Sequence, residues 1–159
     1  MEIRTACKSD ASEICQVLRR SIAELCHDDH RGDPKILDEW LRGKTPETVT
    51  KWITNPQNDM LVATLDGKIA GTACRHGNQI TLNYVSPDAR LLGVSHALLM
   101  ALEDRIREEG GDRVMLESTT TALQFYQSRG YRQCSEQKQK FGIIAWPLSR
   151  QLEAGSSLC

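Results

Sequence analysis

The chain has 159 residues, enough for one compact domain but few for two domains with cores of ordinary size. Twenty Lys and Arg residues against 21 Asp and Glu residues leave a formal net charge of -1, which argues against a nucleic-acid partner. Six cysteines form no C-x-x-C pair and no His spacing typical of metal ligands, so we expect free thiols and no bound metal. Since no apolar run approaches the roughly 18 residues of a membrane span, the expected setting is soluble and cytoplasmic, with no membrane partner.

The N-terminal third of the chain is predicted to be mainly helical. Alternating residues from Glu2 to Cys7 are typical of a short strand. From Ala11 to about Cys26, apolar residues recur every three or four positions, which indicates an amphipathic helix. A polar segment follows, and then Asp33-Pro34 and Thr45-Pro46 each place a capping side chain before a proline at the first helical position. Two further helices are therefore predicted.

The middle of the chain reads as three antiparallel strands. The first two, Asp59 to Leu65 and Lys68 to Arg75, are joined by Asp66-Gly67, a strong signal for a type I′ hairpin turn. The third, Gln79 to Val85, alternates Ile, Leu and Tyr with Thr and Asn. The segment that follows this meander is the one around which the rest of the chain is organised.

That segment joins the third strand to a long helix and predicts an anion site. Pro87 ends the strand, and the apolar period changes to three and four residues between Gly93 and Gly110. Gly93 and Ser95 put little bulk over the first amides of the helix, and Arg90 adds a positive charge beside them. A phosphate is the natural ligand of such a helix start, although an ordinary capped surface turn fits these residues equally well.

The C-terminal part is predicted to return to the sheet. Asp112 to Glu117 resembles a buried strand, and the long helix before it makes it a parallel neighbour of the preceding strand. A helix is expected from Thr119 to Ser128, followed by a strand pair at Tyr131 to Ser135 and Phe141 to Leu148. Residues 153–159 are expected to be a disordered tail.

Two segments also match a known family pattern. The hexapeptide RLLGVS from Arg90 to Ser95 is similar to Q/R-x-x-G-x-G/A, with Ser95 where the pattern has Gly or Ala. Further along, Thr119 to Tyr131 is similar to N-x-x-A-x-x-F-Y-x-x-x-G-F/Y, with Thr119 in place of Asn. Together and in this order they resemble the GNAT superfamily of N-acetyltransferases. The resemblance implies one α/β (α+β) domain over residues 1–152, with helices on both faces of a mixed, mostly antiparallel sheet of six to seven strands and a splayed central parallel strand pair.

What the resemblance implies for function is acetyl transfer from acetyl-CoA, the co-substrate, to a primary amine by direct attack in a ternary complex. The loop would hold the pyrophosphate, and the pantetheine arm would pair with the fourth strand. The implied cofactor-binding residues are Tyr84, Val85, Arg90, Leu91, Leu92, Gly93, Val94, Ser95 and Thr119. Tyr126 matches the motif's Tyr and would protonate the departing sulfur, whereas the residues alone favour plain aromatic packing.

The sequence leaves the proton acceptor and the amine site open. Many relatives carry a carboxylate on the fourth strand, where this chain has Thr81, Leu82 and Asn83. The candidate substrate-binding residues are Asp29, His30, Trp40 and Asn83. Each of the first three also fits a simpler role in a polar loop or in the core. We expect a small, amino-acid-like or polyamine-like amine as the acceptor.

Two other functions fit the same features. A non-catalytic module that binds or senses acyl-CoA is slightly favoured by the missing strand carboxylate and by Thr119, but Tyr126 argues against it. Acetylation of a protein amine is the second alternative. A homodimer is one possible assembly of the chain.

Overall fold

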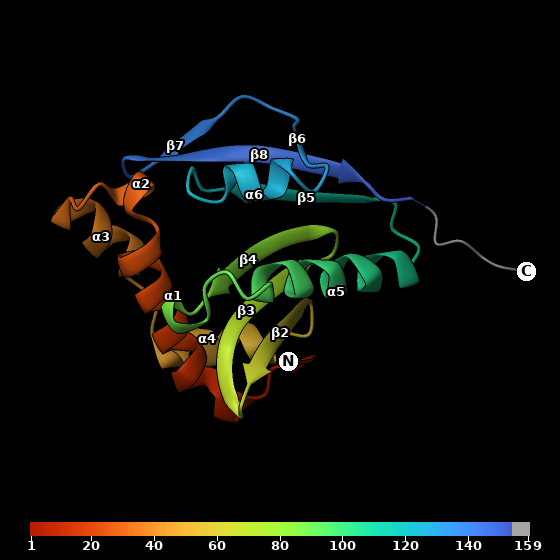
Figure 1. Cartoon of the computed structure of the whole chain (residues 1–159), viewed down its shortest axis with the longest axis horizontal. Helices are drawn as coiled ribbons and strands as arrows, with labels where there is room; N and C mark the ends of the chain where they lie inside the picture. The colour runs from red at the N-terminus through yellow and green to blue at the C-terminus, as the bar shows by residue number, and fades with distance from the viewer. Residues whose placement is uncertain (154–159) are drawn as a thin grey trace, which may run out of the picture.

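The computed structural model describes residues 1–153 and shows an eight-stranded sheet between two layers of helices (Figure 1). The strands are β1 (Glu2–Thr5), β2 (Asn58–Leu65), β3 (Lys68–His76), β4 (Gln79–Val85), β5 (Arg113–Ser118), β6 (Arg132–Gln133), β7 (Lys138–Lys140) and β8 (Ile143–Gln151). The helices are η1 (Lys8–Asp10), α1 (Ala11–Leu25), α2 (His27–His30), α3 (Pro34–Leu41), α4 (Pro46–Thr54), η2 (Pro87–Ala89), α5 (Val94–Glu108) and α6 (Leu123–Gln127). The strand order is β1-β2-β3-β4-β5-β8-β6, and β7 pairs with β8.

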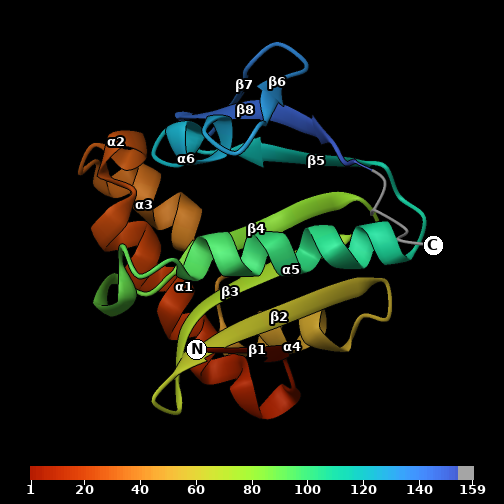
Figure 2. The ribbon, with the colours of Figure 1, turned by 45° about the vertical axis from the view of Figure 1, so that its right-hand side comes forward.

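Helices cover both faces of the sheet, as predicted. Helix α5 packs on one face through Val94, Leu98 and Leu102, and Figure 2 shows it in front of the sheet, with its axis roughly along β4 and β2. On the opposite face, the buried side of α1 packs with Val49 of α4 against β2 and β3. Gly71 of β3 permits the close approach of α5, because a Cβ there would lie 2.6 Å from Val94 Cγ1.

The sheet opens between β4 and β5, its parallel pair. Pairing is confined to Gln79 with Met115 and Ile80 with Leu116, at the start of β4. The register of β4 against β3 shifts between Cys74 and Arg75, which is typical of a bulge that bends a strand. Beyond Ile80 the two strands diverge, so the predicted splayed pair is confirmed.

The C-terminal strands differ from the prediction. The expected strand over 131–135 shrinks to β6, and a separate strand, β7, forms farther along the chain. Both pair with the long β8, at its far and near ends respectively. The sheet therefore has eight strands instead of six to seven, because two short strands share one long partner.

Two helical predictions also need correction. The helix expected from Thr119 begins only at Leu123, since the Thr119 hydroxyl oxygen accepts the N–H of Ala122 (3.1 Å) and holds a turn there. The polar segment after α1 is not simply a loop, because it contains the one-turn helix α2. Elsewhere, positive φ angles at Asp66 (51°) and Gly67 (77°) confirm the predicted hairpin turn.

Other composition-based expectations can be compared with residues 1–153. Cys7, Cys15, Cys26, Cys74 and Cys134 are free thiols, as their spacing predicts. Within this range, no helix combines the length and apolar character needed to cross a bilayer. Nearly all of the predicted tail, with Cys159, lies outside the described residues.

Candidate active site

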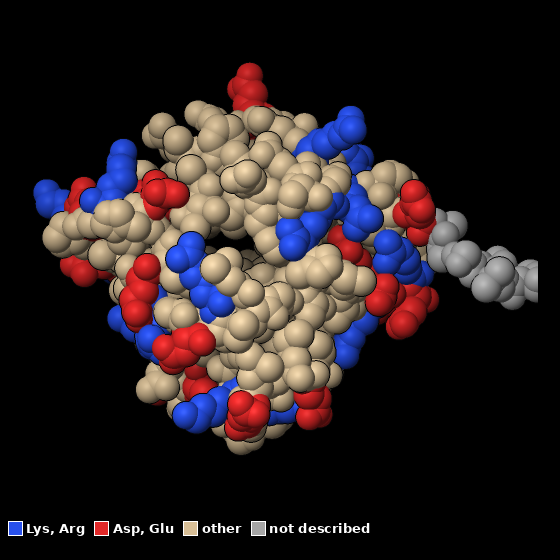
Figure 3. Space-filling model, viewed as in Figure 1, with Lys and Arg blue, Asp and Glu red and all other residues tan. Residues whose placement is uncertain are grey.

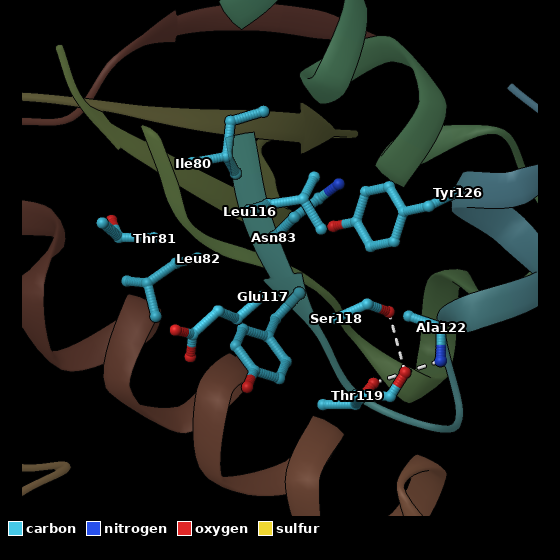
Figure 4. A pocket seen from close by; sticks show the side chains of 11 residues that line it. Ile80, Thr81, Leu82, Asn83, Leu116, Glu117, Ser118, Thr119, Ala122 and Tyr126 are labelled. Carbon is cyan, nitrogen blue, oxygen red and sulfur yellow. Dashed lines mark hydrogen bonds between the residues drawn. The ribbon is translucent and has the colours of Figure 1, made fainter. Parts of the chain in front are cut away.

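A narrow cleft lies where β4 and β5 part, closed at one end by α6. Its volume is about 60 Å³, enough for a group the size of an acetyl, since a water molecule takes about 30 Å³ in the liquid. The lining residues are Ile80, Thr81, Leu82, Asn83, Tyr84, Leu116, Glu117, Ser118, Thr119, Ala122 and Tyr126 (Figure 4). In the space-filling view, a hollow near the centre of this face is bordered by Lys and Arg side chains (Figure 3).

The start of α5 presents backbone amides at the same side of the sheet. Leu91 (φ 66°) and Gly93 (φ 81°) are left-handed, and α5 begins directly after Gly93. The Ala97 N–H is bonded to Gly93 O (3.0 Å), so the N–H groups before it belong to the helix's unpaired first turn. No side chain within the described residues caps this terminus. The exposed Arg90 adds charge to the positive end of the helix dipole.

A second guanidinium lies against the first turn of α5. Arg129 stacks on the Phe125 ring, with its central carbon 3.8 Å from the ring centroid. Its Nε–H donates to His96 Nδ1 (2.8 Å), so Nδ1 is the acceptor nitrogen of that ring. Arg129 therefore adds a second positive charge near the first turn of α5, in addition to Arg90.

Tyr126 and Asn83 lie on the α5 side of the cleft. The Tyr126 ring packs edge-on against Phe125 and Tyr131, and its hydroxyl points toward Asn83 (Figure 4). Burial raises the pKa of Tyr126 to about 12, and the nearby Asn83 amide opposes this shift. The phenol is thus a protonated donor at neutral pH.

Asn83 carries a buried hydrogen-bond acceptor that could bind a ligand. Its Nδ2 donates to Ser95 O (3.3 Å), whereas its buried Oδ1 has no hydrogen-bond partner among residues 1–153. A buried acceptor without a partner costs about 1 to 3 kcal/mol, and a ligand N–H placed here would remove that cost. This orphan acceptor fits a ligand that bears amide groups.

Glu117 is the one carboxylate among the described residues that line the cleft, and sequence reasoning did not single it out. Lys138 (2.9 Å) and Lys140 (2.6 Å) of β7 both contact it. These ammonium groups, Lys140 first, lower the pKa of Glu117, so it is ionised at neutral pH. The alternation of apolar and other residues along β5 is the sequence signal for the position of Glu117, because Met115 and Glu117 share the face opposite the buried Val114 and Leu116.

The structure brings some of the predicted residues together and places others elsewhere. Asn83, Tyr84, Thr119 and Tyr126 line the cleft. Asp29 instead accepts N–H groups from Thr120 (2.7 Å) and Thr121 (3.1 Å) and the Thr121 hydroxyl. His30 is 2% exposed and bonds the backbone at Gly32 and Ala23, and Trp40 is buried against α1 and β8.

Tyr84 joins the cleft to the helical side. Its side chain packs against the core clusters that include α1, α3 and α4. Burial raises the pKa of Tyr84 well above that of an ordinary phenol, so its hydroxyl also stays protonated. Val85 packs on the α5 side, at the end of β4 that leads into the Arg90 loop.

Comparison with known proteins identifies the family to which this chain belongs. The family model described as "Acetyltransferase (GNAT) domain" matches residues 28–152. The chain belongs to the GNAT acetyltransferase family. No curated protein sequence matches this chain.

Solved structures share the GNAT fold at low sequence identity. The GCN5-related N-acetyltransferase from Rhodopseudomonas palustris is 22% identical over 95% of each chain, with a TM-score of 0.85. PaiA N-acetyltransferase from Thermoplasma acidophilum, solved in complex with coenzyme A, is 17% identical over 94% of this chain and 98% of its own, with a TM-score of 0.77. YncA from Salmonella typhimurium, solved with acetyl-CoA, is 19% identical over 100% and 99%, with a TM-score of 0.71.

Proposed function

We propose that this GNAT domain transfers an acetyl group from acetyl-CoA to the primary amine of a small molecule. The observation that carries the proposal is the parting of β4 and β5 beside the uncapped start of α5. That arrangement offers an anion site and an open strand edge to one elongated ligand. The relatives PaiA and YncA, solved with coenzyme A and acetyl-CoA, support this choice of co-substrate.

Acetyl-CoA would be held mainly by backbone groups. The amides at the start of α5, with Arg90, suit the pyrophosphate, and each charge-assisted hydrogen bond is worth about 1.5 to 3 kcal/mol. The part of β4 beyond Ile80 is not paired with β5 and suits an extended arm that adds like a strand. Asn83 Oδ1 suits an amide N–H of that arm.

The reaction forms one bond and breaks one. The neutral amine nitrogen attacks the thioester carbonyl carbon, the C–N bond forms, and the C–S bond breaks as the thiolate of coenzyme A leaves. Tyr126 donates a hydrogen bond to the sulfur as negative charge builds there. With a pKa of about 12, against about 8.5 for an ordinary thiol, the phenol mainly stabilises this charge, and any proton it gives up is regained from water.

Glu117 is the proposed partner of the acceptor amine. An alkylammonium with a pKa of about 10.4 must lose a proton before it attacks. Once the amine lies in the cleft, the ionised Glu117 takes up its proton directly or through water. Its lowered pKa makes it a weak base, so the proton passes on to solvent instead of remaining on the carboxylate.

Calorimetric titration with coenzyme A and a thiol-release assay over a panel of amines test this function. We expect binding of coenzyme A and release of one thiol per acetylated amine. Absence of coenzyme A binding contradicts the proposal outright. Binding without turnover on any amine would establish a non-catalytic acyl-CoA module, and turnover only on peptide N-termini or lysines would establish a protein acetyltransferase.

A further inference from the structure

A second cavity opens directly beside the cleft. Its volume is about 310 Å³, within the range of small-molecule pockets. The residues that line it are Trp52, Asn58, Cys74, His76, Thr81 and Leu82, and we call it the Trp52 pocket. Because Thr81 and Leu82 also line the cleft, the two cavities adjoin across one stretch of β4. A ligand whose reacting end lies in the cleft can therefore extend into the Trp52 pocket.

The walls of the Trp52 pocket suit an uncharged apolar group. Trp52 of α4, the buried Cys74 and Leu82 are its apolar side chains. The polar side chains Asn58 and His76 already have hydrogen-bond partners. Asn58 Nδ2 donates to Trp52 O (3.2 Å). The other amide atom, Asn58 Oδ1, therefore accepts a hydrogen bond from His76 Nδ1 at 3.2 Å, so Nδ1 carries the ring proton. None of the six described lining residues is Asp or Glu, so a buried ammonium would find no carboxylate there.

The charges at the other end of this combined groove favour one ammonium group over several. Glu117 is a single carboxylate, and Lys138 and Lys140 beside it bring the local charge to +1. A monoamine can meet Glu117 with its only cationic group. The further ammonium groups of a polyamine would meet the two lysines or the uncharged Trp52 pocket, and both positions are unfavourable.

We propose that the Trp52 pocket binds a ring-sized apolar group of the acceptor, so the preferred substrates are primary monoamines with an apolar tail. This inference rests on the proposed acetyl transfer. A cavity of about 150 Å³ lined by apolar side chains already binds benzene, so the space beside Trp52 is sufficient. Thr81 and Leu82 form the passage between the bound ring and the amine.

Thiol release with 2-phenylethylamine, ethanolamine and spermidine tests the preference. We expect kcat/KM for 2-phenylethylamine to exceed that for either other amine by at least about tenfold. Trp52→Ala should lower the ratio of 2-phenylethylamine to ethanolamine turnover by about tenfold, mainly through KM. Met100→Ala, which removes an exposed apolar side chain from the outer side of α5, is the matched control and should leave the ratio unchanged.

A second variant keeps the test independent of folding, because Trp52 also packs against the core. Thr81 is exposed on a strand, where an aromatic residue is tolerated, so Thr81→Phe fills the passage with little cost to the fold. It should also lower the ratio about tenfold. A ratio unaltered in both folded variants, or a preference for spermidine in the wild type, overturns the proposal.

Binding measured without turnover separates this inference from the proposed function. In nitrogen-15 correlation spectra recorded with and without coenzyme A, 2-phenylethylamine should shift the indole N–H signal of Trp52, assigned by its loss in the Trp52→Ala protein. The indole signals of Trp40 and Trp146 are internal controls. If the protein turns over no amine but Trp52 shifts, the pocket stands and the acetyl-transfer function fails. If Trp52 does not shift at saturating amine, the pocket proposal fails whatever the enzyme does.

Discussion

The carboxylate of Asp29 in α2 accepts the backbone N–H of Thr120, 91 residues further along the chain, at 2.7 Å. The same carboxylate accepts the N–H of Thr121 at 3.1 Å. These bonds connect the helical side of the molecule to the loop between β5 and α6. Because that loop leads into the helix that carries Tyr126, the buried Asp29 positions the proposed proton donor without touching it.

Asp29→Ala should therefore reduce both stability and turnover. It leaves two amide N–H groups without an acceptor, at a cost of about 1 to 3 kcal/mol in the free energy of unfolding, measurable by urea denaturation. The loop should loosen, and kcat should fall about tenfold with little change in coenzyme A affinity. Asp28→Ala, an exposed neighbour, is the control and should change neither. Equal behaviour of the two variants would remove Asp29 from this role.

Tyr126→Phe tests the sulfur-directed hydrogen bond. Removal of one donor aimed at developing charge typically lowers kcat by about 100-fold or more, and coenzyme A affinity should stay within about twofold. Tyr131→Phe is the matched control, since its hydroxyl donates to the buried Glu103 (2.7 Å), and its loss should lower stability and leave kcat nearly intact. Unchanged turnover in Tyr126→Phe would contradict the mechanism.

Local patterns predicted most of the fold for a physical reason. The change of apolar period at Gly93 and the turn signal Asp66-Gly67 report backbone geometry that depends on near neighbours. The two family-like segments then implied a splayed central parallel strand pair, with the fourth strand as the partner of the pantetheine arm. Features determined within about ten residues were readable from the sequence.

The missed features depend on contacts between distant segments. Alternation in β5 places Glu117 on a face, but only the divergence of β4 and the arrival of Lys140 from β7 make it an ionised group beside a cleft. In the same way, no local sequence pattern predicts that the Asp29 carboxylate accepts a hydrogen bond from the backbone N–H of Thr120. Such long-range pairs follow from the assembled sheet and helices, which is why the proton acceptor could not be assigned from sequence.

Arg90→Gln tests the charge at the proposed pyrophosphate site. Loss of one charge-assisted contact of about 1.5 to 3 kcal/mol should raise the dissociation constant of coenzyme A about 10- to 100-fold, with kcat at saturation unchanged. The affinity should also depend less on salt than in the wild type. Arg132→Gln in β6, also exposed, is the control. Equal effects of the two variants on calorimetric affinity would place the phosphates elsewhere.

Gly93→Ala tests the backbone at the same loop. A Cβ on Gly93 would meet no atom within 4 Å, so the strain comes from its φ of 81° and should cost about 1 to 2 kcal/mol of stability. Gly77 has the same open surroundings and a φ of 62°, which makes Gly77→Ala a matched control for stability. Both variants should be similarly destabilised, and only Gly93→Ala should weaken coenzyme A binding. A binding loss shared by both would show a general effect of instability.

The pair of lysines on β7 makes the pH dependence of the reaction a test of Glu117. If the ionised carboxylate is needed, the rate falls as pH drops through its pKa, and Lys138 and Lys140 hold that pKa below its ordinary value. Replacing both lysines by Met removes this stabilisation of the charged form and raises the pKa. The acidic limb of kcat/KM should therefore move to higher pH, while the alkaline side, where Tyr126 remains protonated, should stay in place.

Glu117→Gln provides the decisive comparison for this pH effect. It should lower kcat/KM about 100-fold, and the double Lys→Met change made in that background should no longer move the acidic limb. Lys8 and Lys51 lie outside the cleft, so Met at those two positions changes net charge equally and should leave the profile in place. A limb that moves with the β7 lysines even when position 117 is Gln would show that another group titrates, and Glu117 would then not be the proton acceptor.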